Sequence, residues 1–142
     1  MPRMLLFRIG SEQYGLELEA LQEVADDPLL HGVPQTGAFL LGAVNLHGRV
    51  LPVIDLPALL GMAAVPRDPR LVVLSPEFHS LALAVSGVGR IVSFDADNLQ
   101  MPPDDEKFKV ITGMVDIGAQ GEQVNLLDAG ALIERLQTIY NA

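Results

Sequence analysis

An internal repeat is the feature of this sequence that most constrains its fold. Residues 48–55 read Gly-Arg-Val-Leu-Pro-Val-Ile-Asp, and residues 121–128 read Gly-Glu-Gln-Val-Asn-Leu-Leu-Asp, with the same spacing between Gly and Asp. The segment 42–46 is echoed in the same order by 113–117, and the apolar residues of 7–24 recur at a nearly constant offset in the second half. A shared order of this kind indicates two copies of one structural unit.

The first copy contains a predicted β-hairpin. Two apolar, β-branched segments, 42–46 and 50–54, flank His47-Gly48, and Gly readily takes the positive φ that a tight reversal needs. Asp55 then stands where its carboxylate can cap the free amides of a short helical turn. A strand, a turn, a second strand and a capped helical turn therefore follow one another directly.

Each half supplies about five short strand candidates, which predicts an all-β chain of two small barrels with short helices and a C-terminal helix. We expect one domain over 1–142, with sub-barrels at approximately 1–65 and 66–142 that exchange a strand or a terminal segment with each other. Either half alone is too small to be comfortably stable, so the barrels should share one apolar core. The local pattern also predicts a helical turn over 19–24 and a turn at 87–90.

Charge and composition exclude several classes of partner. The 142 residues include 18 acidic and 9 basic ones, a formal net charge of −9, so nucleic acid is not an expected partner because its phosphates require a basic surface. No apolar run approaches the roughly 20 residues that span a bilayer, so no direct membrane insertion is expected. The absence of cysteine fits a reducing cytoplasm.

The sequence offers no constellation for catalysis or metal binding. His31, His47 and His79 lack a second ligand at helical spacing, and no nucleophile motif or phosphate-binding glycine loop is present. We therefore expect no catalytic residues, no metal site and no cofactor, and a protein that is not an enzyme.

One long stretch carries a family resemblance. Residues 41–56, Leu-Gly-Ala-Val-Asn-Leu-His-Gly-Arg-Val-Leu-Pro-Val-Ile-Asp-Leu, resemble the signature of CheW-like chemotaxis coupling domains. Further similarity runs nearly end to end, through Tyr14-Gly15-Leu16, Gln22-Glu23-Val24, Val33-Pro34 and the closing segment 124–128 with its helix.

The resemblance implies two five-stranded SH3-like barrels and a non-catalytic adaptor. In this family one barrel surface packs against a histidine kinase regulatory domain, and the groove between barrels takes the cytoplasmic tip of a chemoreceptor. A cytoplasmic location with recruitment to membrane receptor arrays would follow. The residues expected to bind partners are Glu23, Val24, Val33, Leu46, His47, Gly48, Arg49, Val50 and Val88.

Two positions depart from the family pattern. His47 stands where Arg is usual, and Ser86 stands where Asp is frequent. An Arg could hold a carboxylate such as Glu23 in a fixed geometry, whereas His does so weakly and only when protonated. The departures favour a divergent system such as type IV pilus (twitching) signalling. The alternatives are a regulatory decoy that binds the kinase but no receptor, and a ligand-sensing module that uses Arg49 and Arg90.

A plainer interpretation applies to the same residues. His47 can be an exposed turn residue without a further role, and any one of the apolar positions can be core.

Overall fold

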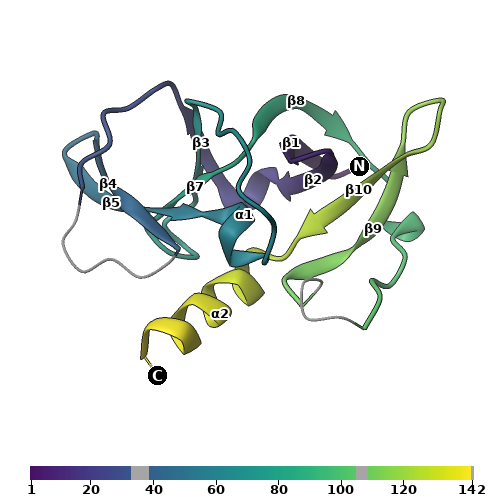
Figure 1. Ribbon diagram of the computed structural model, residues 1–142. Coiled ribbons are helices and arrows are strands. Elements are labelled where there is room, and N and C mark those ends of the chain that lie inside the picture. The colour runs from purple at the N-terminus through teal and green to yellow at the C-terminus, as the bar shows by residue number, and fades with distance from the viewer. Residues whose placement is uncertain (33–38, 105–108, 142) are drawn as a thin grey trace.

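The computed structural model describes residues 1–32, 39–104 and 109–141. Strands dominate the fold, and they form two five-stranded sheets that lie side by side (Figure 1). The elements in chain order are β1 (Arg3–Ile9), β2 (Glu12–Glu17), the 3₁₀ turn η1 (Leu18–Ala20), β3 (Leu21–Ala25), β4 (Leu40–Leu46), β5 (Arg49–Asp55), α1 (Leu56–Leu59), β6 (Leu71–Leu74), β7 (Ala82–Ala84), β8 (Gly87–Ser93), the 3₁₀ turn η2 (Ala96–Asn98), β9 (Ile111–Ile117), β10 (Glu122–Leu127) and α2 (Ala129–Asn141).

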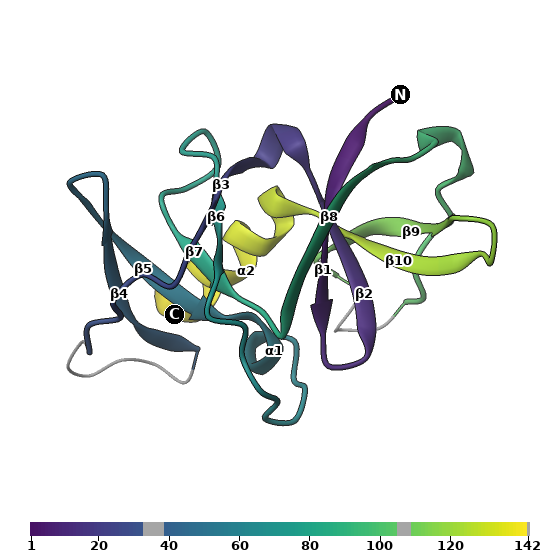
Figure 2. The same cartoon turned by 90° about the horizontal axis from the view of Figure 1, so that it is seen from above.

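The two sheets have corresponding strand orders. One runs β3-β6-β7-β5-β4 and the other β8-β1-β2-β10-β9. Each contains a single parallel pair at the same place, β5 with β7 in the first and β10 with β2 in the second, while the other pairs are antiparallel. The sequence repeat is thus a repeat of strand order (Figure 2).

The chain is divided unequally between the sheets. The first sheet, which we call the continuous barrel, uses one segment, 21–84, whereas the other, the split barrel, combines 3–17 with 87–127. Each sheet therefore takes strands from both sides of residues 65 and 66, as the expected exchange of segments allows. The parallel partner of β5 is β7, from beyond that point, and the parallel partner of β10 is β2, from the start of the chain.

Three apolar clusters hold the fold together. Val44 and Val53 belong to a cluster within the continuous barrel, and Leu6 and Val124 to one within the split barrel. The largest lies between the barrels and combines residues of β1, β2, β6, β7, α1 and α2, among them Phe7, whose ring stacks on Tyr14 with centroids 5.8 Å apart. The prediction of an all-β chain with a shared core is confirmed.

Two local predictions were wrong. Residues 21–25 form β3 rather than part of a helical turn, because Val24 pairs with Val72 of β6 and this tertiary pairing overrides the helical spacing. The expected turn at 87–90 is the first half of β8. There Gly89 allows a close approach, since a Cβ at that position would lie 3.1 Å from the carbonyl oxygen of Leu6.

The two Asp residues that end the repeated segments each cap a helix, as predicted for Asp55. The Asp55 carboxylate accepts a hydrogen bond from the Ala58 amide at 3.3 Å, and the Asp128 carboxylate accepts one from the Ala131 amide at 3.0 Å. Each Asp thus satisfies one of the amides that a first helical turn leaves free. None of the helices in the described ranges is long and apolar enough to cross a membrane.

Candidate functional site: the β4–β5 hairpin rim

The turn between β4 and β5 forms the centre of the predicted site. His47 and Gly48 have φ values of +54° and +80°, and Leu46 and Arg49 pair directly across the turn. Two successive residues at positive φ are the mark of the two-residue hairpin turn that matches strand twist. Gly48 adopts this conformation at no cost, whereas His47 does so with some strain.

The ring of His47 contacts Glu23 across the continuous barrel. Its Nε2 lies 3.0 Å from both Oε1 and Oε2 of Glu23, which is on β3. Strands β3 and β4 are the two ends of the sheet order, so this contact joins the edges that strand pairing leaves apart. The His47 side chain is 68% exposed, and a pair so exposed contributes at most about 1 kcal/mol to stability. Its main effect is to hold the β4–β5 turn against β3.

A second side-chain contact holds the other side of the turn. The Arg49 guanidinium donates a hydrogen bond to Oγ of Ser80, in the loop between β6 and β7. Next to it Val50 is 71% exposed, although its neighbour Leu51 is buried inside the barrel. We call Glu23, Leu46, His47, Gly48, Arg49 and Val50 the hairpin rim. The structure brings these six predicted residues together.

The remaining predicted residues lie elsewhere. Val24 and Val88 are partly buried against the core between the barrels, and Val88 belongs to β8 of the split barrel. Leu46 is also partly buried, against the core of the continuous barrel, so it has a packing role that Val50 lacks. Val33 lies outside the described residues.

Two charged residues in the segment before β6 were missed. Arg70 forms a bidentate contact with Asp68, Nε to Oδ1 at 3.0 Å and Nη2 to Oδ2 at 2.8 Å. The same pair holds the backbone of Val88, whose amide donates to Asp68 and whose carbonyl accepts from Arg70. The Arg70 guanidinium lowers the pKa of Asp68 to about 2. Pro66 and Pro69 interrupt any strand or helix pattern in this stretch, and the Asp-x-Arg spacing was the available signal.

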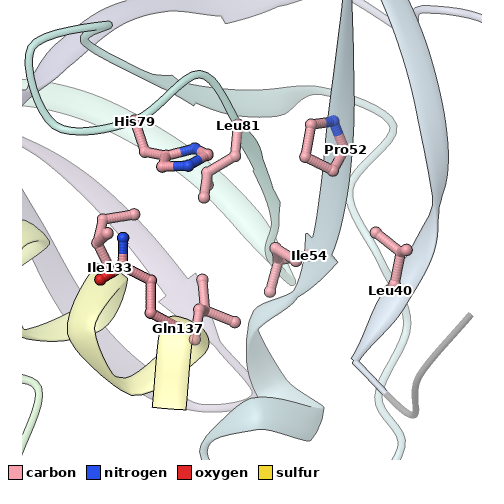
Figure 3. Close-up of a pocket in the computed structure, with 8 residues that line it drawn as sticks. Leu40, Pro52, Ile54, His79, Leu81, Ile133 and Gln137 are labelled. Carbon is pink, nitrogen blue, oxygen red and sulfur yellow. The ribbon is translucent and has the colours of Figure 1, made fainter. Parts of the chain in front are cut away.

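An apolar pocket lies beside the rim (Figure 3). It has a volume of about 240 Å³ and opens between the outer face of β5 and helix α2. Pro52 and Ile54 form one wall, Ile133 and Gln137 the other, and His79 lies at its edge. On β5, residues 50, 52 and 54 share one face, so the exposed Val50 continues the apolar lining toward the hairpin turn.

The residues flagged for ligand binding do not converge on a site. Arg49 is engaged by Ser80, and Arg90 is exposed on β8 of the other barrel. Within the described ranges, no three His, Asp or Glu side chains are grouped as metal ligands.

These features define a class of protein, a twin-barrel interaction module that presents a preorganised surface. The chain belongs to the CheW-like domain family, which matches residues 3–137. It is 27% identical over 125 residues to the chemotaxis protein CheW of Klebsiella aerogenes, covering 87% of this chain and 75% of that protein. It is 31% identical over 136 residues to protein FrzA of Myxococcus xanthus, covering 90% and 82%.

A solved structure shows the same fold. The scaffolding protein TtCheW of Thermoanaerobacter tengcongensis superposes with a TM-score of 0.77 at 23% identity, over 89% of each chain. As a member of this family the protein is a non-catalytic scaffold or adaptor of chemotaxis signalling. Proteins of the family in general couple chemoreceptors to a kinase.

Proposed function

We propose that this protein couples the cytoplasmic tip of a chemoreceptor to the regulatory domain of a histidine kinase, in the cytoplasm at a membrane receptor array. The observation that carries the proposal is the hairpin rim. It exposes an aliphatic side chain, Val50, next to the polar residues His47 and Arg49. Glu23 and Ser80 already hold those two polar side chains in place. A surface ordered before binding loses less conformational entropy on association, and this favours affinity.

The rim and the core between the barrels offer two separate places for two partners. Val24 and Val88 lie against that core, on β3 and β8, the end strands of their sheets. We assign the rim to the kinase regulatory domain and the Val24–Val88 region to the receptor tip. An adaptor requires two such surfaces, because both partners must be held at once.

Val50 is the best position at which to test the rim. A Val50→Asp variant should bind the kinase regulatory domain tenfold or more weakly, since it places a charge in the apolar centre of the interface. Its melting temperature should barely change, because Val50 is exposed. Leu46→Asp would be less informative, because Leu46 also packs against the barrel core. Isothermal titration calorimetry with the isolated regulatory domain measures the effect.

Ile91→Asp is the matched control. Ile91 is another exposed aliphatic residue in a strand, 49% exposed on β8 of the split barrel, so it should leave rim binding unchanged. An equal loss of affinity for the regulatory domain in both variants would contradict the assignment of the rim. Unchanged affinity in Val50→Asp would contradict it as well.

His47 favours a second candidate, a divergent pathway of the pilus (twitching) type or a decoy that binds the kinase alone. An imidazole lacks the fork of donors with which Arg would grip Glu23. The similarity to FrzA supports a divergent system. The decoy hypothesis differs from the assignment above in placing the receptor contact at the hairpin rim, so under it a His47→Arg variant should gain affinity for a standard chemoreceptor tip. Unchanged receptor binding would favour the divergent pathway with its own receptor.

A further inference from the structure

A second hollow lies where the split barrel meets the segment that precedes β6. Its volume is about 200 Å³, and its lining includes Arg8, Gln13, Asp68, Arg70 and Gly87. In the strand register Arg8 stands between Gln13 of β2 and Gly87 of β8. Three side-chain positions from adjacent strands therefore form one row on the wall of the hollow.

Arg8 lies against the backbone of Gly87. A Cβ at Gly87 would come within 2.7 Å of Nη2 of Arg8 and within 3.2 Å of its Cζ, so a side chain at this position would displace the guanidinium. Nη1 donates to the carbonyl oxygen of Gly10 at 2.7 Å. No carboxylate in the described ranges lies within salt-bridge distance of Arg8. Within the described residues the Arg8 guanidinium therefore has no ion-pair partner, although the chain as a whole is strongly acidic.

The nearby acid cannot serve Arg8, because its acceptors are occupied. Oδ1 of Asp68 accepts from the Arg70 amide and Nε, and Oδ2 accepts from Arg70 Nη2 and the Val88 amide. Asp26 also acts on Arg70 electrostatically. Asp68 and Arg70 therefore neutralise each other, and Arg8 is the remaining charged side chain among the residues that line the hollow.

We propose that this hollow binds a small oxyanion, a carboxylate or a phosphate group, with Arg8 as the charged ligand and the Gln13 amide as a second donor. A guanidinium offers a planar fork of donors that fits two oxygens of such a group. The Asp68–Arg70 pair also lines the hollow, and the volume of about 200 Å³ limits the ligand to a compact group. This site is separate from the hairpin rim, but Val88 lines both the hollow and the region assigned to the receptor tip. Binding of a small oxyanion does not require the adaptor function.

Nuclear magnetic resonance titration of the ¹⁵N-labelled full chain tests the proposal. Inorganic phosphate and sodium acetate are added in separate series at constant ionic strength. Saturable shifts are expected at the amides of Gly87, Val88 and Gly89 and at the side-chain amide of Gln13. Arg8→Gln should weaken binding about tenfold or more, since it removes a charged hydrogen-bond donor.

Two further variants sharpen the test. Arg90→Gln removes the same charge from an exposed position on β8 and should bind like the native chain. Gly87→Ala displaces the guanidinium without removing its charge and should also weaken binding. Saturation by phosphate alone or by acetate alone would support the site and identify its oxyanion. Shifts that do not saturate, or that are equal in Arg8→Gln and Arg90→Gln, would overturn it.

Discussion

Replacing Asp68 by Asn should lower stability in a pH-dependent way. The carboxylate accepts four hydrogen bonds from Arg70 and Val88, and its side chain is only 9% exposed. Arg70 chiefly lowers the pKa of Asp68, from the ordinary 3.8 to about 2. At 1.36 kcal/mol for each pKa unit, a lowering of this size would correspond to about 2.5 kcal/mol of stabilisation without screening by solvent. The Arg70 side chain is 43% exposed and solvent screens the pair, so we expect about 1–1.5 kcal/mol at pH 7.

The sign of the pH effect follows from the lowered pKa. A carboxylate with a lower pKa in the folded state stabilises the fold above the unfolded-state pKa, and this contribution is lost as pH falls from about 4 through 2. The free-energy difference between the native chain and Asp68→Asn should therefore shrink to roughly half by pH 3. All other carboxylates titrate in both proteins, so the difference isolates Asp68.

Urea unfolding followed by circular dichroism at pH 7 and pH 3 measures both quantities. Asp116→Asn, on an exposed position of β9, removes the same charge and should change the unfolding free energy by less than about 0.5 kcal/mol. A difference between native and Asp68→Asn that is the same at both pH values would refute the argument, because the ionised carboxylate would then not be the stabilising group.

Two further predictions concern backbone positions of the repeat. Gly42→Ala should destabilise the chain by about 1–3 kcal/mol in the same unfolding assay, because its Cβ would lie 2.3 Å from the carbonyl oxygen of His31. Gly32→Ala is the control, since a Cβ there meets nothing within 4 Å. Equal losses of stability in the two variants would refute the close-approach explanation. Asp128→Ala should lower the free energy of unfolding by about 1 kcal/mol, because it removes the cap of α2. Asp55→Ala should lower it by less, because α1 has only four residues. A larger loss of stability in Asp55→Ala than in Asp128→Ala would contradict this order.

The features predicted well from the sequence are those with local causes. The reversal at His47-Gly48 depends on two residues, and each Asp cap depends on amides three positions away. The repeat also predicted two equivalent units. It could not predict which strands join which barrel, since the pairings of β2 with β10 and of β5 with β7 are parallel and distant along the chain.

The candidate site was predicted in composition but not in detail. The family resemblance pointed to Glu23 and the turn at His47, and the structure places them in contact. Apolar character alone could not separate Val50, which is exposed, from Leu46, which is partly buried. Asp68 and Arg70 were overlooked because their partner Val88 is distant in sequence and prolines flank them.

The unequal division of the chain has a consequence for synthesis on the ribosome. All strands of the continuous barrel have been made once residue 84 is complete, so that barrel can form while translation continues. The β1–β2 hairpin is made before the continuous barrel but must wait for β8 and β10, which end at residues 93 and 127. Throughout that interval its apolar residues lack the neighbours that β8, β10 and α2 supply. The β1–β2 hairpin is therefore the part of the described chain that stays incompletely paired for longest during synthesis.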